Sequence, residues 1–374
     1  MRITVSTLAA TLLAPALFAP ALFAQSSSDI ILKKDGARLR GIMVTEFLLS
    51  GVRGKRGSDE VEVPAHQVAN IEWSGLPEEF LAGRAAMDRG DFENAAQMFG
   101  AVQSDRALLK ADAEFFKIKA AVAGIGGDKS AAATAAEHAK SWLSANANHW
   151  RTPEAMLLAG RAERLAGTGG TAATTLKELD ESAVRDGWGS IWSVRGKYEL
   201  ALTLLADGKA SEARTQFKSA ASAADGAMQA SSEDKAELQS LKTLARVGEG
   251  ETYLTDKKYD RAKTFFRGLT NDKDLALQAA GHAGHGEALF LAAGDDTKKL
   301  RAAQMALATA AVVDPSAGEA SAKAYYYLGR CMLALGPEHA GEGFKDRAKA
   351  YFALVYTSYA SSRWAGAAKT EAAK

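Results

Sequence analysis

The sequence predicts a mainly α-helical protein, in which a small β module precedes a solenoid of about seven helical hairpins. Small residues recur at spacings of 37 to 49 residues over the last three-quarters of the chain. Between residues 29 and 73, apolar residues follow a strand-like alternation instead. Residues 1–24 form an apolar stretch of a third kind. These three patterns divide the chain into three parts.

The amino-terminal stretch, residues 1–24, resembles a bacterial secretory signal peptide. We expect cleavage after Ala24, with Ala21 as the alternative position. Pro15 and Pro20 disfavour the uninterrupted helix that a membrane anchor would need. No cysteine lies near the cleavage position, so no lipid anchor is expected. The mature protein is therefore predicted to be periplasmic or secreted, without stable insertion in a membrane.

Residues 29–75 are predicted to form four or five short strands. The apolar run 30–32 leads into the turn dipeptide at 35–36, and valines alternate with polar residues from residue 61 onward. Residues 54–59 are predicted to be a charged loop. The pattern resembles the small SH3-like and Sm-like barrels of exported bacterial proteins. This resemblance implies a closed β-barrel with little room for a catalytic pocket.

Three basic residues accompany the predicted loop. They are Arg53, Lys55 and Arg56. We interpret them as a solvated loop tip, with contact to an anionic partner as the alternative.

Seven alanines carry the repeat in the remainder of the chain: Ala95, Ala135, Ala172, Ala213, Ala262, Ala303 and Ala348. Apolar residues follow four and seven positions after each, from Phe99 and Val102 to Phe352 and Val355. Offsets of 0, 4 and 7 lie on one face of an α-helix. A second small residue lies earlier in most units, and a turn sequence separates the two. Each unit is therefore predicted to be two helices that approach each other closely.

This pattern resembles the tetratricopeptide repeat family. The unit at 248–269 matches the family pattern best, through Gly250, Tyr253, Ala262, Phe266 and Leu269. Two departures stand out: Glu163 occupies a position where the family has an aromatic residue, and the second unit, 107–146, has alanine at most positions. The resemblance covers residues 77–368. It implies a superhelix whose concave face binds protein or peptide segments.

The family lines this concave face with residues of the first helix of each hairpin, three before, one after and four after the small residue. These offsets predict a partner-binding groove lined by Phe80, Arg84, Arg161, Arg164, Tyr198, Glu251, Glu287, Phe290, Tyr326 and Arg330. Arginine and aromatic residues often dominate interface energies. The aromatic residues are explained equally well by packing against the next hairpin. The lysine and asparagine clamp of chaperone-type members is missing at these positions, so recognition of a terminal carboxylate is not predicted.

No catalytic, cofactor-binding or metal-binding motif emerges from the sequence. The one cysteine, Cys331, lies in an apolar run and is expected to be buried and inert. His282 and His285 are three residues apart, but no third metal ligand completes a motif beside them. Residues 124–130 end in Lys-Ser like a phosphate loop, yet they lack the preceding glycine and follow a helix pattern. We therefore interpret them as a turn between helices.

The charge balance excludes a bulk electrostatic attraction to nucleic acid or anionic membranes. The chain has 46 basic and 45 acidic residues, and removal of residues 1–24 takes away only Arg2, which leaves 45 of each. The predicted function is an exported, non-enzymatic scaffold for a protein or peptide partner in the cell envelope. A structural or peptidoglycan-associated envelope protein is the alternative, and an enzyme is disfavoured.

Overall fold

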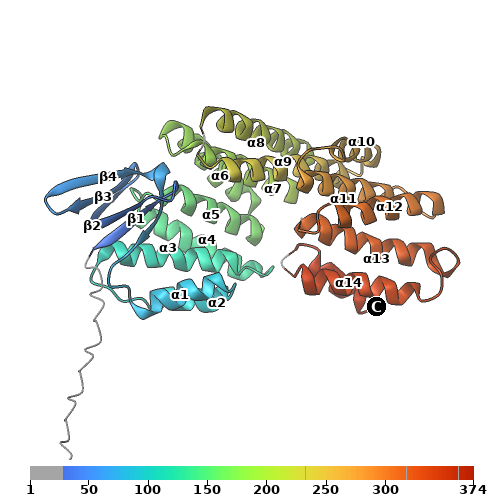
Figure 1. Ribbon diagram of the computed structural model, residues 1–374, viewed down its shortest axis with the longest axis horizontal. Coiled ribbons are helices and arrows are strands. Elements are labelled where there is room, and N and C mark those ends of the chain that lie inside the picture. Colours follow the sequence, from blue (N-terminus) through green and yellow to red (C-terminus); the bar gives the residue numbers. More distant parts are fainter. Residues whose placement is uncertain (1–27, 232, 317, 361) are drawn as a thin grey trace, which may run out of the picture.

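The computed structural model describes residues 28–374 except for 232, 317 and 361. The predicted signal peptide, residues 1–24, lies outside the described residues. Within them, a five-stranded antiparallel sheet precedes a stack of α-helices that continues to residue 372 (Figure 1). None of the described helices combines the length and apolar character that crossing a lipid bilayer requires.

The sheet is built from one continuous meander and a fifth strand that returns to its start. Its strands are β1 (Asp29–Lys33), β2 (Arg38–Leu48), β3 (Gly51–Arg56), β4 (Asp59–Pro64) and β5 (Val68–Glu72). The strand order is β4-β3-β2-β1-β5. Because β4 and β5 are the two edges of this order, hydrogen bonds do not close the described sheet, and the predicted closed barrel is not confirmed.

The turns of the module agree only partly with the sequence prediction. Gly36 has a φ of 84°, so the dipeptide at 35–36 forms the predicted turn between β1 and β2. The predicted loop at 54–59 is wrong, because β3 extends through Arg56 and pairs with β4. Arg53 lies on this strand within ion-pair distance of Glu46 and Glu62, rather than at a loop tip. The charged side chains of β3 follow its buried Val52 and hide the strand periodicity from the sequence.

Seven antiparallel helical hairpins and one final helix follow the sheet in the described part of the chain. The hairpins are α1 (Glu78–Asp88) with α2 (Phe92–Ala101), α3 (Ala107–Ala123) with α4 (Lys129–Ala145), α5 (Thr152–Ala166) with α6 (Gly169–Arg185), α7 (Ser190–Ala206) with α8 (Ala210–Ala230), α9 (Lys235–Thr255) with α10 (Tyr259–Leu269), α11 (Leu275–Leu291) with α12 (Thr297–Val313), and α13 (Gly318–Ala340) with α14 (Phe344–Ser358). The final helix is α15 (Ala365–Ala372). This confirms the predicted solenoid of about seven helical hairpins, including the turn at 124–128 between α3 and α4.

The repeat pattern corresponds to the core of the solenoid. All seven repeat alanines are buried, and so are the residues four and seven positions after each of them. Gly250 of α9 lies against the ring of Phe266 on α10, and Gly284 of α11 lies against the same ring from the next hairpin. An added Cβ at either glycine would come within 2.4 Å of this ring. Small residues therefore allow contact both within a hairpin and between hairpins.

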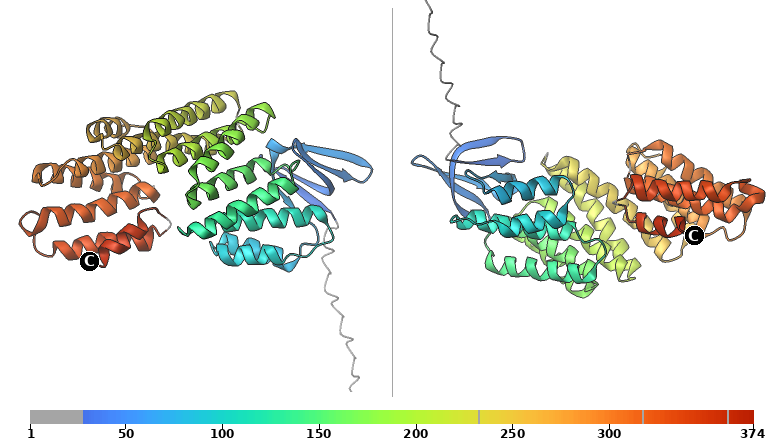
Figure 2. Two further views of the ribbon diagram at one scale, coloured as in Figure 1. Left: turned by 180° about the vertical axis from the view of Figure 1, so that it is seen from behind. Right: turned by 90° about the horizontal axis from the view of Figure 1, so that it is seen from below.

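The hairpins stack into an arch. Figures 1 and 2 show α1–α6 at one end and α11–α14 at the other, with α7–α10 between them. Successive odd-numbered helices from α3 to α13 contact each other, while the even-numbered helices of the described chain have no comparable contacts with one another. A curved stack brings its layers closest on the inside of the curve, so the odd-numbered helices form the inner face.

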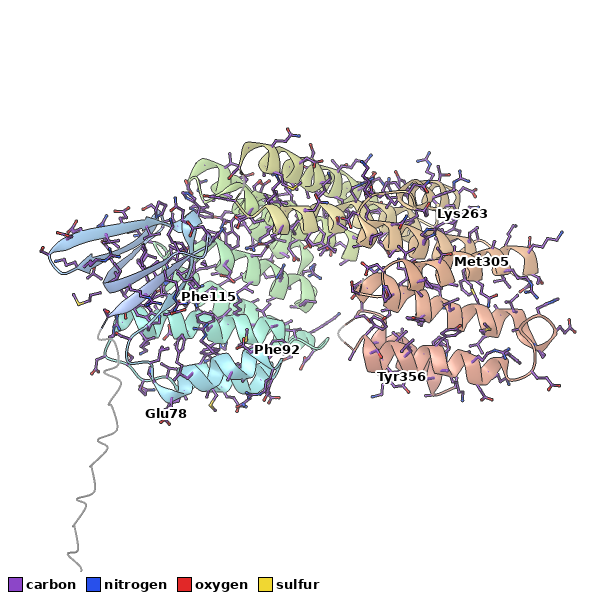
Figure 3. The ribbon with its side chains drawn as sticks, in the orientation of Figure 1. Glu78, Phe92, Phe115, Lys263, Met305 and Tyr356 are labelled. Carbon is purple, nitrogen blue, oxygen red and sulfur yellow. The ribbon has the colours of Figure 1, made fainter. Side chains whose placement is uncertain are left out.

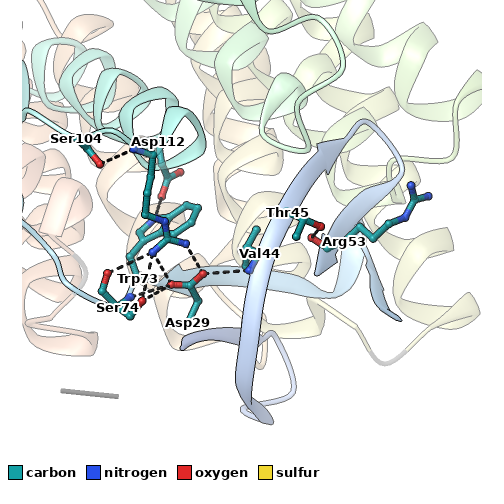
Figure 4. A network of polar contacts seen from close by, with 9 residues as sticks. Asp29, Val44, Thr45, Arg53, Trp73, Ser74, Ser104 and Asp112 are labelled. Carbon is teal, nitrogen blue, oxygen red and sulfur yellow. Dashed lines mark hydrogen bonds and ion pairs between the residues drawn. The ribbon is translucent and has the colours of Figure 1, made fainter. Parts of the chain in front are cut away.

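A polar network fastens the sheet to the second and third hairpins, and Figure 4 shows its part around Asp29, Trp73 and Asp112. Arg106 donates from Nη1 and Nη2 to the two carboxylate oxygens of Asp29 at 2.9 and 2.5 Å. Asp112 accepts from Trp73 Nε1 at 3.0 Å and from Arg151 Nε at 2.7 Å. We call these five residues the joint. Ile31, Ile42 and Val52 of the sheet share one apolar core with Phe80 and Phe99 of the first hairpin, so the sheet and the solenoid are packed as one body.

Candidate partner-binding groove

A cavity of about 470 Å³ lies on the inner face, between three successive first helices. Its lining consists of Ala236, Gln239, Ser240, Thr243, Leu244, Val247 and Glu251 of α9, Asp274, Ala276, Ala280 and Ala283 at and along α11, Glu319, Ala320 and Lys323 of α13, and Arg363 after α14. We call this cavity the groove. Its volume lies within the range of about 300–1,000 Å³ that is typical of ligand sites.

Small and apolar side chains form the middle of the groove. Ala280, Ala283 and Ala320 have short side chains, which leave room between neighbouring helices. Leu244 is 42% exposed, which is unusual for a large apolar side chain on the inner face of a folded repeat. The groove therefore presents an apolar floor at the surface of the inner face.

One end of the groove is a cluster of charged residues, which we call the charged cluster: Glu251, Glu287, Glu319, Lys323 and Arg363. Lys323 is 5% exposed and lies between two carboxylates, with Nζ 2.5 Å from Glu287 Oε2 and also bonded to Glu251. Glu287 Oε1 in turn accepts a hydrogen bond from the Tyr327 hydroxyl at 2.8 Å. A buried ammonium requires such partners, because an unpaired buried charge costs several kcal/mol, roughly 3–5 when one partner is removed.

Arg363 closes the charged cluster from the carboxyl-terminal side. Its Nη2 lies 3.0 Å from Glu251 Oε2 and its Nε lies 3.8 Å from Glu319 Oε2. The backbone N–H of Arg363 donates to Glu319 Oε1 at 3.1 Å. The guanidinium stacks on the ring of Trp364, with 5.0 Å between its Cζ and the ring centroid. A residue near the end of the chain thus reaches back to α9 across the inner face.

The two buried carboxyl groups of the charged cluster have opposite pKa shifts. Burial raises the pKa of Glu287, helped by the negative charge of Glu251 and only partly offset by Lys323. Burial alone would also raise the pKa of Glu251, but the charges of Lys323 and Arg363 outweigh it and lower that pKa. Glu251 is therefore the carboxylate that holds its charge most firmly.

A second polar group on the inner face belongs to α5 and α7. Arg161 Nε and Arg164 Nη2 both donate to the carboxylate of Glu199. Burial, and next the charge of Glu199, raise the pKa of Tyr198 to about 12. The two predicted arginines thus share one acidic partner, which leaves a positive excess at this part of the inner face.

The structure brings some predicted groove residues together and removes others from the surface. Phe80 is 1% exposed and packs against Phe99, so the prediction that it lines a groove is wrong. Tyr326 is also buried, against Phe352 and Trp364. These two aromatic rings form the core beneath their helices, which was the alternative interpretation.

The remaining predicted residues lie in three places. Glu251 and Glu287 belong to the charged cluster. Phe290 of α11 packs at a tilted angle against Tyr327 of α13 and lies under the guanidinium of Arg330. Arg84 lies half-buried on α1, in the first hairpin and away from the groove. The predicted set therefore does not form one continuous site.

Sequence reasoning missed several residues that line the groove, although the signal was present. Leu244, Ala280 and Lys323 each lie six residues before the small residue of their helix, which is Gly250, Gly286 or Gly329. That offset extends the predicted helix face by one further turn toward the amino terminus. Arg363 has no such signal, because it lies outside the hairpins and reaches the groove only through the fold.

No described group of three or more histidine, cysteine, aspartate or glutamate side chains is arranged to hold a metal ion. His285 Nδ1 lies 3.1 Å from the carbonyl oxygen of Lys263, which marks it as a packing residue. Burial raises the pKa of Cys331 to about 12, so its thiol is protonated and unreactive at neutral pH.

A second cavity, of about 370 Å³, lies where the sheet meets α5, α7 and α9. Three tryptophans line it: Trp150, Trp188 and Trp192. The charged residues around it are paired across the walls, as in the ion pairs Lys34 with Asp234 and Arg195 with Glu237. These pairs connect the sheet with the helices, so we assign this cavity to the packing of the module.

No family model and no curated protein matches the chain. Among solved structures, it is similar to a Rap protein complexed with Competence and Sporulation Factor, with 14% identity over 74% of each chain and a TM-score of 0.42. It is also similar to the apo form of the quorum sensor NprR from B. thuringiensis, with 11% identity over 79% of this chain and 86% of that chain and a TM-score of 0.46.

Proposed function

We propose that the protein is an exported, non-enzymatic scaffold that binds a segment of a protein or peptide partner in the groove of its inner face. The observation that carries this proposal is an open apolar floor between α9, α11 and α13, with charged residues at one end. Such a floor with an exposed Leu244 is typical of interaction sites, and polar groups at its end can orient a bound segment.

Site-specific photo-crosslinking in the native envelope tests the binding site. A crosslinkable amino acid is placed at Leu244 in the groove or at Met305, which is 71% exposed on α12 and is marked in Figure 3. We expect one defined protein to be crosslinked from position 244 and not from position 305. The purified partner should then bind the Met305→Glu variant like the wild type and should lose binding to Leu244→Glu.

The opposite results would overturn the proposal. Equal crosslinking from both positions, or equal binding by both variants, means that the groove is not the binding site. If both variants still sediment with purified peptidoglycan, this would instead favour the structural envelope role.

Export is part of the proposal and rests on residues 1–24 alone. Fractionation of bacterial cells that produce the full chain should place the protein outside the cytoplasm. Amino-terminal sequencing should then begin at Gln25, or at Leu22 if cleavage follows Ala21. An intact amino terminus in the cytoplasmic fraction would contradict export.

A further inference from the structure

We propose that the charged end of the groove binds an arginine side chain of the partner segment, and that Arg363 occupies this place in the free protein. This inference rests on the proposed function, because it names the chemistry of the segment that the groove takes. It is carried by the charges, the contacts and the exposure of the charged cluster.

The charges of the cluster favour a cation from outside. Without Arg363, three carboxylates (Glu251, Glu287 and Glu319) face the single ammonium of Lys323. Even if Glu287 is protonated, Glu251 and Glu319 still outnumber that ammonium. The apolar floor beside the cluster lowers the local dielectric and strengthens the attraction for an incoming cation. The cluster is therefore complementary to a basic group.

The geometry favours a guanidinium over an ammonium. Two different nitrogens of the Arg363 side chain lie near two carboxylates, Nη2 near Glu251 and Nε near Glu319. Its guanidinium carbon also lies over the ring of Trp364, 5.0 Å from the ring centroid. Arginine provides a rigid set of donors and an aromatic-stacking face, while lysine provides one point charge. Arg363 thus shows how a guanidinium of a partner would be held.

Arg363 is the exchangeable member of the cluster. Its side chain is 53% exposed, whereas Lys323 is 5% exposed. The Arg363–Glu319 pair is exposed on both sides and contributes little to stability, and Lys323 stays paired with the buried Glu251 when the Arg363 side chain is released. Removal of Lys323 would instead leave buried carboxylates without a counter-charge. An arginine of the partner can therefore replace Arg363 while the rest of the cluster stays in place.

The groove also restricts the residues next to this arginine. Ala280, Ala283 and Ala320 leave room beside the charged cluster, next to the exposed Leu244. Short apolar side chains fit such a space, while acidic side chains would meet Glu251 and Glu319. The expected partner segment is an arginine followed or preceded by small apolar residues.

Selection from a phage-displayed library of random dodecapeptides tests this inference on the mature full-length protein. The wild type, Arg363→Ala, Glu319→Gln and Leu244→Glu serve as targets, and Arg301→Ala on the outer helix α12 is the matched control for the loss of a cation. Selected peptides are then synthesised with arginine or with uncharged citrulline at the same position, and their affinities are measured by fluorescence anisotropy.

We expect arginine-containing peptides that bind Arg363→Ala about tenfold more tightly than the wild type or Arg301→Ala. The citrulline forms and the Glu319→Gln variant should each lose about tenfold in affinity. A different outcome is that Leu244→Glu abolishes peptide binding while citrulline and Arg363→Ala leave the affinity unchanged. This result would overturn the arginine inference and leave the proposed function standing. If no selected peptide depends on Leu244, the proposed groove fails as well.

Discussion

The joint and the charged cluster are both ionic networks inside the same solenoid, yet they differ in exposure and in charge balance. In the joint, Arg151 is 3% exposed and Asp112 is fully buried, and each basic residue has its own acidic partner. In the charged cluster, acidic groups are in excess and Arg363 at its rim is half-exposed. A balanced network with a buried ion pair at its centre can hold two parts of a fold together permanently. An unbalanced network with an exposed member is suited to exchange.

The surroundings of the two networks differ in the same sense. Arg151 is enclosed by aromatic rings, with its Cζ 4.8 Å from the Phe115 centroid and 4.2 Å from the Trp150 centroid. The charged cluster instead borders an open cavity on the inner face. The joint is thus part of the core, whereas the cluster is part of a surface. Four measurements test how far this contrast holds.

The largest effect is expected from Arg151→Ala in the joint. This change leaves Asp112 buried without its cation, which should lower the free energy of unfolding by about 3–5 kcal/mol. Chemical denaturation followed by circular dichroism measures it. Arg185→Ala, which removes an exposed partner of Asp186, is the control and should leave the transition unchanged. Equal transitions for the two variants would mean that the joint is not the firm point of the fold.

A smaller effect is expected from Gly250→Ala beneath the groove. The new methyl group would meet the Phe266 ring, which Gly284 confines from the other side, so the variant should lose about 1–3 kcal/mol of unfolding free energy. Gly226→Ala on α8 is the matched control, because nothing lies within 4 Å of its Cβ position. Alanine should stabilise that helix by about 0.5–1 kcal/mol. Changes of the same sign at both sites would contradict the close packing described above.

Lowering the pH should change the contributions of the two networks to the unfolding free energy in opposite directions. Burial disfavours the charged form of Asp29 and by itself would raise its pKa. Hydrogen bonds from Arg106, Ser74 and Val44 outweigh this effect of burial and lower the pKa of Asp29 below 3.8. The stability that Asp29 contributes is therefore present above pH 3.8 and is lost as the pH falls through its lowered value. The pKa of Glu287 is raised above 4.5, so the folded protein binds this proton first and gains stability as the pH falls toward 4.5.

The difference in unfolding free energy between the wild type and Glu287→Gln isolates the contribution of Glu287. We expect the wild type to become more stable relative to the variant as the pH is lowered from 7 to 4.5. Urea unfolding at each pH measures this difference in unfolding free energy. A difference that is constant over this range would show that Glu287 titrates normally.

The smallest effect is expected at Cys331, behind the charged cluster. Its thiol is buried and its pKa is about 12, so a thiol reagent at pH 8 should label the folded protein very slowly and the unfolded protein at once. Labelling of the Arg363→Ala variant should be equally slow, because the exchangeable arginine does not hold the hairpin together. Rapid labelling of that variant would mean that Arg363 is structural.

Local regularity explains why much of the solenoid is predictable. The alanines at 95 to 348 and the apolar residues that follow them repeat on one helix face, so their burial follows from the hydrophobic pattern of short segments. The same logic failed for β3, where charged residues follow the buried Val52, and for Phe80, whose burial depends on Phe99 and Phe116 of neighbouring helices. Patterns within one element say which face is buried, but not what covers the other face.

The positions of the hairpins, their helical faces and the absence of a catalytic motif follow from the order of the amino acids, because the 3.6-residue period and the turn residues act locally. The groove does not follow in this way. Lys323 and Glu251 are 72 residues apart, and Arg363 lies beyond the last full hairpin. Their contact depends on the curvature of the stacked hairpins, which sums many small packing angles along the chain, and no single segment specifies that sum.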